Sequence, residues 1–154
     1  MDEQAKKTAL RMLTYGLYAV AARHGNEVAA MTVNFLTQCA FTPPMVAVAV
    51  ELDSKAGRFI ESAGRFAVNI YESGQRELAG QLGRKSINRP DKFDNVPWTP
   101  GPATGAPLLE DALSWLECQV RSKVESGDHT IYVAAVVEAG VHRDGIPLTM
   151  EETG

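Results

Sequence analysis

Two adjacent prolines, Pro43 and Pro44, stand directly before MVAVAVEL at 45–52, which contains the apolar run 45–50. Proline has no backbone N–H to donate and blocks a helix, so a new element is expected to begin here. The Val and Ala residues that follow suit a pleated surface, because β-branched side chains pack well there. We expect a strand at 45–52. The run is far too short to span a bilayer.

Six further β-favouring runs are separated from one another by turn residues. They occupy 17–23, 27–33, 66–70, 113–124, 130–137 and, as a short closing strand, about 140–142. Gly and Asn tolerate positive φ, so His24-Gly25-Asn26 predicts a hairpin between the first two runs. Glu125-Ser126-Gly127-Asp128 is a turn sequence that joins the long pair of runs.

Helical spacing of apolar residues and capping signals predict three short helices. They are expected at 4–13, from Asp53 or Ser54 to about Ala63, and at 75–82. The segment 84–107 is rich in Pro and predicts a long loop, which makes it a candidate lid over a ligand because such loops are often functional. Six or seven strands joined mostly by hairpins indicate a mainly β fold, an antiparallel β-barrel with peripheral helices. We expect one domain over 1–154.

The overall composition argues against several classes of partner. The net charge is −4, and the 15 Lys and Arg residues are scattered along the chain, so a nucleic-acid partner is not expected. The N-terminus lacks the apolar core of a signal segment, and we expect a cytoplasmic protein without membrane contact. The two Cys and three His residues are dispersed, so no metal site is expected.

The segment from Met31 to Phe41 is unusually polar for a strand between two apolar strands. Hydroxyl and amide side chains stand at Thr32, Asn34, Thr37 and Gln38. Such groups need hydrogen-bond partners when they are buried, so the segment can line a polar ligand site. The alternative is a bulged strand whose polar residues face solvent. On this segment alone the alternative is favoured, since Thr is common in strands.

A second candidate site begins at the predicted helix start near Ser54. A helix N-terminus offers unpaired backbone N–H groups and the positive end of the helix dipole. Ser54 adds a hydroxyl, and Lys55 and Arg58 add two cations within one turn, so this segment is suited to bind a phosphate. The alternative is a routine N-cap with solvated cations, which is the commoner arrangement.

The order of these motifs resembles one known family. The run AMTVNFLTQCAFTPPMVAVAVELDSKAGRFIESAGRFAVNIYE is similar to the flavin reductase-like, FMN-binding split-barrel family, in which a G/A-M-T-x-N/S stretch precedes a PP-led strand, a Ser-containing helix start and an F-x-V-N strand. Later pieces follow in the family's order: Gln75, Leu78-Ala79, Leu82, Lys92-Phe93, Gly105-x-Pro107-Leu108, Leu116-Glu117-Cys118 and Gly127-Asp128-His129. The resemblance covers roughly 9–148.

The resemblance implies a six-stranded antiparallel split barrel that works as a homodimer, with flavin bound near the subunit interface. It implies that the flavin ring and ribityl chain lie along Thr32, Asn34, Phe35, Leu36, Thr37 and Gln38. It places the flavin phosphate at Ser54, Lys55 and Arg58. It also places His129 on the nicotinamide side of the pocket, as the candidate catalytic residue. The alternative for His129 is a solvent-exposed turn histidine.

The activity implied is hydride transfer from NADH or NADPH to a flavin, FMN or else FAD. The cofactors carry that chemistry, which is consistent with a sequence that shows no catalytic triad. One alternative is an electron-transfer protein that keeps its FMN bound and is reduced by a partner protein. Another is a split barrel that binds a small ligand but no flavin.

Overall fold

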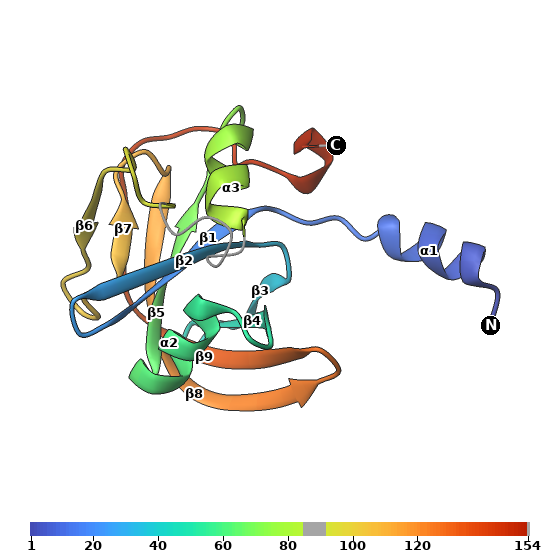
Figure 1. Cartoon of the computed structure of the whole chain (residues 1–154), viewed down its shortest axis with the longest axis horizontal. Coiled ribbons are helices and arrows are strands. Elements are labelled where there is room, and N and C mark those ends of the chain that lie inside the picture. The colour runs from blue at the N-terminus through green and yellow to red at the C-terminus, as the bar shows by residue number, and fades with distance from the viewer. Residues whose placement is uncertain (85–91, 154) are drawn as a thin grey trace.

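The computed structural model of the chain describes residues 1–84 and 92–153 (Figure 1). In chain order the elements are α1 (Glu3–Arg11), β1 (Tyr18–His24), β2 (Glu27–Val33), β3 (Leu36–Ala40), β4 (Met45–Glu51), α2 (Lys55–Ala63), β5 (Arg65–Ile70), α3 (Arg76–Gly83), β6 (Trp98–Pro100), β7 (Pro107–Leu109), β8 (Ser114–Ser126), β9 (His129–Val141) and the 3-10 helix η1 (Met150–Thr153). The expected mainly β fold with peripheral helices is confirmed.

The main sheet is antiparallel throughout and curls back on itself. Within the described residues it has seven strands in the order β2-β1-β5-β8-β9-β4-β3. Its two outermost strands, β2 and β3, are consecutive in the chain and are joined only by Asn34 and Phe35. The sheet must therefore curve until its two edges meet at this junction, as a split barrel does.

The long strands β8 and β9 make the curvature possible. The first part of β8 pairs with β5 up to Gln119, whereas the first part of β9 pairs with β4 up to Ala135. The β8–β9 register shifts between Glu117 and Cys118 and again between Val120 and Ser122. Irregularities of this kind bend a strand and increase its twist. The β8–β9 hairpin can therefore pair with β5 in one half of the sheet and with β4 in the other.

The structure differs from the sequence-based expectations at three places. The six-strand count is not confirmed, because residues 36–40 form the separate edge strand β3 on β4. The expected closing strand at 140–142 is instead the end of β9, which continues to Val141. The predicted loop 84–107 contains β6, which pairs with β7 as a second, two-stranded sheet. The part of the candidate lid at 85–91 lies outside the described residues.

Two apolar clusters hold the helices against the sheet. Inside the curl, Val20, Val48 and Phe66 are fully buried, and Ile60 of α2 closes this cluster. On the outer face, α3 packs its buried Leu82 against the second cluster. Burial of this apolar area is the main force that fixes both helices, since helices this short are marginal alone.

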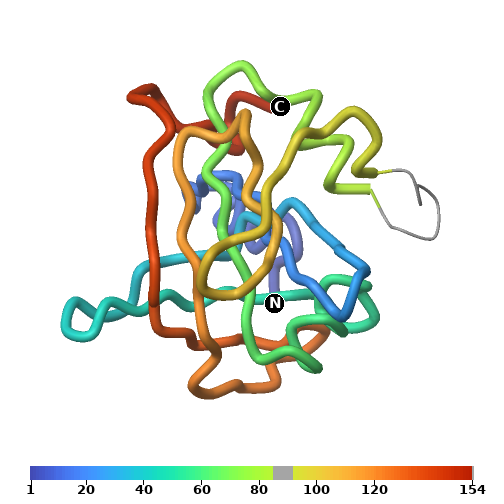
Figure 2. Tube along the Cα trace, turned by 90° about the vertical axis from the view of Figure 1, so that its left-hand side faces the viewer, coloured from blue at the N-terminus to red at the C-terminus, as the bar shows by residue number. Residues whose placement is uncertain are grey.

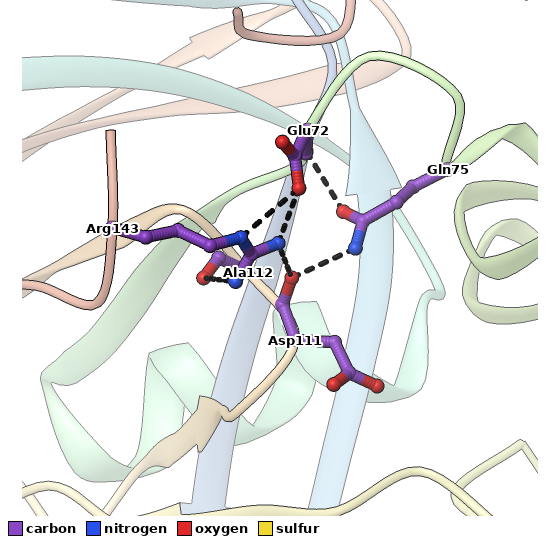
Figure 3. A network of polar contacts seen from close by, with 5 residues as sticks. All are labelled: Glu72, Gln75, Asp111, Ala112 and Arg143. Atoms are coloured by element: carbon purple, nitrogen blue, oxygen red, sulfur yellow. Dashed lines mark hydrogen bonds and ion pairs between the residues drawn. The ribbon is translucent and has the colours of Figure 1, made fainter. Parts of the chain in front are cut away.

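A polar network fixes the start of α3 (Figure 3). The Arg143 guanidinium donates to Glu72 Oε1, with Nη2 at 2.5 Å, and to the carbonyl oxygens of Asp111 and Ala112. Gln75 Nε2 donates to the same Asp111 carbonyl at 2.7 Å, and Gln75 Oε1 accepts from the Glu72 backbone N–H. The turns before α3 and β8 are thereby joined, which anchors the start of α3.

Candidate functional site

A cleft of about 370 Å³ opens where the two edges of the curled sheet meet. Its walls are the end of β2, the β2–β3 junction, the start of α2, the end of α3 and the first residue of β9. Of the residues predicted for a ligand site, seven line this cleft: Thr32, Asn34, Phe35, Ser54, Lys55, Arg58 and His129. The two segments singled out from the sequence therefore face the same space.

The start of α2 is built as a capped helix. Ser54 Oγ accepts from the Gly57 backbone N–H at 3.1 Å and donates to the Glu51 carbonyl at 3.0 Å. A Cβ at Gly57 would come within 2.6 Å of Ser54 Oγ, so glycine is required for this cap. The Ser54 hydroxyl thus acts as a routine N-cap. Among the described residues, the first-turn N–H groups of Lys55 and Ala56 have no hydrogen-bond partner and stand at the positive end of the helix dipole.

Two cations of α2 lie at this end of the cleft. The Lys55 ammonium is 3.7 Å from Glu27 Oε2 and 5.7 Å from the centre of the Phe59 ring. Arg58 is exposed, and its Nη1 donates to the Asp53 carbonyl at 2.8 Å. Both side chains have remaining N–H donors. An anion at the helix start would therefore meet two positive charges.

A third cation, Lys92, comes from the segment before β6 and was not predicted as a site residue. Lys92 is 6% exposed, and its Nζ donates to the Ala30 carbonyl at 3.2 Å. Burial, and then repulsion from the Lys55 charge, lowers the pKa of the Lys92 ammonium. No carboxylate of the described residues forms an ion pair with it. Buried cations are normally paired, so an anion bound in the cleft would give Lys92 a partner of opposite charge.

Lys92 gives the cleft an expected pH dependence. A bound anion favours the charged form of Lys92 and raises its pKa, so anion binding takes up a proton in the range where free Lys92 is neutral. The cleft therefore binds an anion with its full affinity at pH values below the pKa of free Lys92. The affinity falls as the pH rises through this pKa, which lies below the ordinary value of 10.5. Phosphate titrations monitored by NMR between pH 7 and 10 measure this. An affinity that stays constant over that range would contradict it.

The polar run after Met31 divides at the junction of β2 and β3. Thr32, Asn34 and Phe35 line the cleft, whereas Leu36, Thr37 and Gln38 do not. The last two are exposed on the edge strand β3, where a register shift follows Gln38, so this half fits the bulged, solvent-facing alternative.

The Thr32 hydroxyl is already occupied within the fold. It donates to the Ala79 carbonyl at 2.6 Å, which leaves its oxygen to accept from Tyr71 Oη at 2.9 Å. Burial raises the pKa of Tyr71, so this phenol stays protonated as the donor. The hydroxyl of Thr32 thus attaches β2 to α3, and its proton is not available to a ligand.

His129, the first residue of β9, lines the cleft. Its Nδ1 is 2.6 Å from Asp128 Oδ1, and its ring centre is 5.4 Å from that of Phe35. The hydrogen bond to His129 lowers the pKa of Asp128. The His129 side chain is 21% exposed, so it is not a freely solvated turn histidine. The cleft thus combines a cationic end with an aromatic wall, which suits a ligand that carries both a phosphate and a planar ring.

Comparison with known proteins agrees with this combination. A family model described as "Flavin reductase like domain" matches residues 10–153. The chain belongs to this family. It is also 36% identical over 118 residues to a Streptomyces globisporus protein named NADH-dependent FAD reductase, with 75% of this chain and 64% of that protein covered.

Two further relatives show the range of the family. A Moorella thermoacetica protein named high molecular weight rubredoxin is 32% identical over 143 residues, covering 92% of this chain and 62% of that protein. The solved structure of the Streptomyces globisporus NADH:FAD oxidoreductase SgcE6 in complex with NAD and FAD fragments has a TM-score of 0.87 at 29% identity, covering 99% of this chain and 90% of that one. The chain spans slightly less than two thirds of the two curated relatives.

Neither a metal-binding cluster nor a membrane-spanning helix is found in the described part of the chain. No three His, Cys, Asp or Glu side chains of residues 1–84 and 92–153 gather as metal ligands would. No helix in these ranges has the length and apolar character to cross a membrane.

Proposed function

We propose that this chain is an NAD(P)H-dependent flavin oxidoreductase and that residues 1–154 act as one flavin-binding domain. The observation that carries the proposal is the convergence of the α2 start, Lys55 and Lys92 on the cleft that Phe35 and His129 line. The cationic end would hold the flavin phosphate, and the aromatic wall would border the flavin and nicotinamide rings. The family membership and the names of its reductase relatives support this assignment.

The chain's own residues would position and shield the reactants. Flavin supplies the hydride-accepting chemistry when it is bound. Lys55, Arg58 and the free N–H groups of α2 would fix one end of the ligand by charge, and Phe35 would exclude water from one side of its ring. Asp128 holds Nδ1 of His129, so Nε2 remains for a polar group of the nicotinamide nucleotide. Positioning of this kind converts an encounter of two ligands into one bound geometry.

An anaerobic assay tests the proposal. The protein is mixed with NADH or NADPH and with FMN or FAD, and nicotinamide absorbance is followed. We expect loss of absorbance with NADH. FMN and FAD are compared at equal concentration, because equal rates would show that the FMN part, which both flavins share, suffices for the reaction. If no combination loses absorbance faster than without the protein, the reductase assignment is wrong.

A second function is suggested by the similarity to the protein named high molecular weight rubredoxin. In that case the chain would keep its FMN bound and exchange electrons with a redox partner protein. Gel filtration separates the two functions, because a bound cofactor stays with the protein whereas a diffusing flavin with micromolar affinity is lost. Protein that binds neither FMN nor FAD would support the third alternative, a split barrel for another ligand.

We also propose a homodimer in the cytoplasm. Helix α1 projects from the rest of the chain, and all nine of its residues are exposed (Figure 1). Leu10 and Leu13 are 56% and 54% exposed, and a nine-residue helix is marginal in water without packing. The turn after β3 also projects, with Phe41 at 87% exposure (Figure 2). Light scattering after gel filtration tests the dimer, and a monomer at micromolar concentration would contradict it.

A further inference from the structure

Three aromatic rings form a continuous row from the N-terminal segment to the cleft. The ring centres of Tyr15 and Phe35 are 5.4 Å apart at an interplanar angle of 54°, and those of Phe35 and His129 are also 5.4 Å apart, at 51°. Tilted contacts at this distance are favourable between aromatic rings. Phe35 and His129 line the cleft, whereas Tyr15 is not one of the residues that line it. The ring of Tyr15 thus reaches the cleft through its contact with Phe35.

The first two rings of the row are anchored by main-chain hydrogen bonds. The Tyr15 carbonyl accepts from the Met150 N–H at 2.9 Å, and the next residue, Gly16, forms an antiparallel bridge with Thr149. The Phe35 carbonyl accepts from the Ala49 N–H of β4 at 2.9 Å. The Tyr15 backbone is thus held by the C-terminal segment, and the Phe35 backbone by the sheet.

The third ring is held by one strong contact and by Phe35. The Asp128 carboxylate fixes Nδ1 of His129 at 2.6 Å, and the neighbouring Phe35 ring limits rotation of the imidazole about this contact. Phe35 is 41% exposed, which is high for a large apolar side chain inside a binding cleft. Without a ring behind it, such a side chain has rotamers that turn away from His129. The Tyr15 ring packs against Phe35 at 5.4 Å and so limits these rotamers.

We propose that Tyr15 is a positioning residue for nicotinamide binding: its ring keeps Phe35 against His129, so the row Tyr15–Phe35–His129 sets the orientation of the His129 ring. The nicotinamide part of this inference rests on the proposed function. The flavin phosphate is held by Lys55, Arg58 and Lys92 on other elements. Loss of the Tyr15 ring therefore weakens nicotinamide binding more than flavin binding, because the charged contacts to the flavin phosphate are unchanged.

The experiment compares Tyr15→Leu, which removes the ring, with Tyr15→Phe, which keeps it. Aromatic contacts of this kind correspond to about a twofold to tenfold change in binding. We expect Tyr15→Leu to raise the KM for NADH by about that factor and the FMN dissociation constant by less, and Tyr15→Phe to behave like the wild type. In a His129→Leu background, Tyr15→Leu adds no further rise. An equal rise in both backgrounds overturns the inference.

A second readout does not depend on turnover. The ring protons of His129 are followed by NMR in the ligand-free protein and assigned by their loss in His129→Leu. We expect Tyr15→Leu to move these signals and Tyr15→Phe to leave them in place. Tyr15→Met, which also removes the ring, is the substitute if Tyr15→Leu does not fold. Unmoved His129 signals overturn the inference, whereas a wild type that fails to oxidise NADH overturns the proposed function instead.

Discussion

Glu117→Ala is expected to destabilise the fold by about 4 kcal/mol, because it removes the acceptor of two buried Thr104 donors and of the part-buried Ala103 N–H. Glu117 is fully buried on β8. Its Oε1 accepts from the Thr104 N–H at 2.9 Å and from Thr104 Oγ1 at 2.6 Å, and its Oε2 accepts from the Ala103 N–H at 3.0 Å. Without the carboxylate these donors have no partner in the interior, and each lost charge-assisted bond costs more than a neutral one.

The segment held by Glu117 makes relaxation difficult. A Cβ at Gly101 would lie 1.9 Å from Glu117 Oε1, so the backbone passes directly over the carboxylate. The same segment is closed by the bond from the Gly105 N–H to the Gly101 carbonyl at 2.8 Å. Water would have to enter this turn to replace the lost acceptor. The loss of folding free energy in Glu117→Ala is therefore expected to remain close to that of leaving buried groups unpaired.

Urea unfolding followed by circular dichroism measures the change, and Glu138→Ala provides a matched control. Glu138 stands opposite Glu117 in the β8–β9 ladder, but it is exposed and accepts only from the neighbouring Ala139 N–H. Its substitution is expected to change the free energy of unfolding by less than about 0.5 kcal/mol. Equal effects of the two substitutions would show that Glu117 contributes no more than a surface carboxylate.

The strands could be predicted where the sequence alternates between apolar runs and turn residues. The turn at Gly25 and the prolines before β4 are local signals, and they placed β1, β2 and β4 to within one or two residues. The edge strand β3 gave no such signal. Its sequence LTQCA is largely exposed and is held by main-chain pairing with β4, a long-range contact that periodicity does not contain.

The candidate site, like the strands, could be predicted from the sequence only where its signals are local. Capping chemistry is local, so Ser54 and Lys55 could be placed at a helix start from the sequence. The assignment of His129 to the cleft came from the family resemblance, and its geometry from the pairing of β9 with β4. Lys92 belongs to the Lys92-Phe93 piece of the family resemblance, but no local pattern marks it as an anion-binding residue. Only the fold shows that its ammonium reaches the Ala30 carbonyl and the neighbourhood of Lys55.

The buried ammonium of Lys92 leads to the second large effect. Lys92→Met keeps the length and apolar stem of the side chain but removes its charge. We expect the dissociation constant for FMN to rise by about tenfold to a hundredfold, since a hydrogen bond to a charged group contributes about 1.5–3 kcal/mol. Lys55→Met is expected to have a smaller effect, because its side chain is 35% exposed and already paired with Glu27. Flavin fluorescence titration measures both.

Riboflavin separates a contact with the phosphate from a general change in the cleft, because it has the same ring and ribityl chain but no phosphate. Its affinity is expected to change by less than about threefold in Lys92→Met. Lys123→Met, which removes an exposed cation paired with Glu61, is the matched control and should leave FMN binding unchanged. Lys92→Met should also remove the loss of phosphate affinity at alkaline pH, since the group that titrates is gone. Equal losses for FMN and riboflavin would place Lys92 at the ring and not at the phosphate.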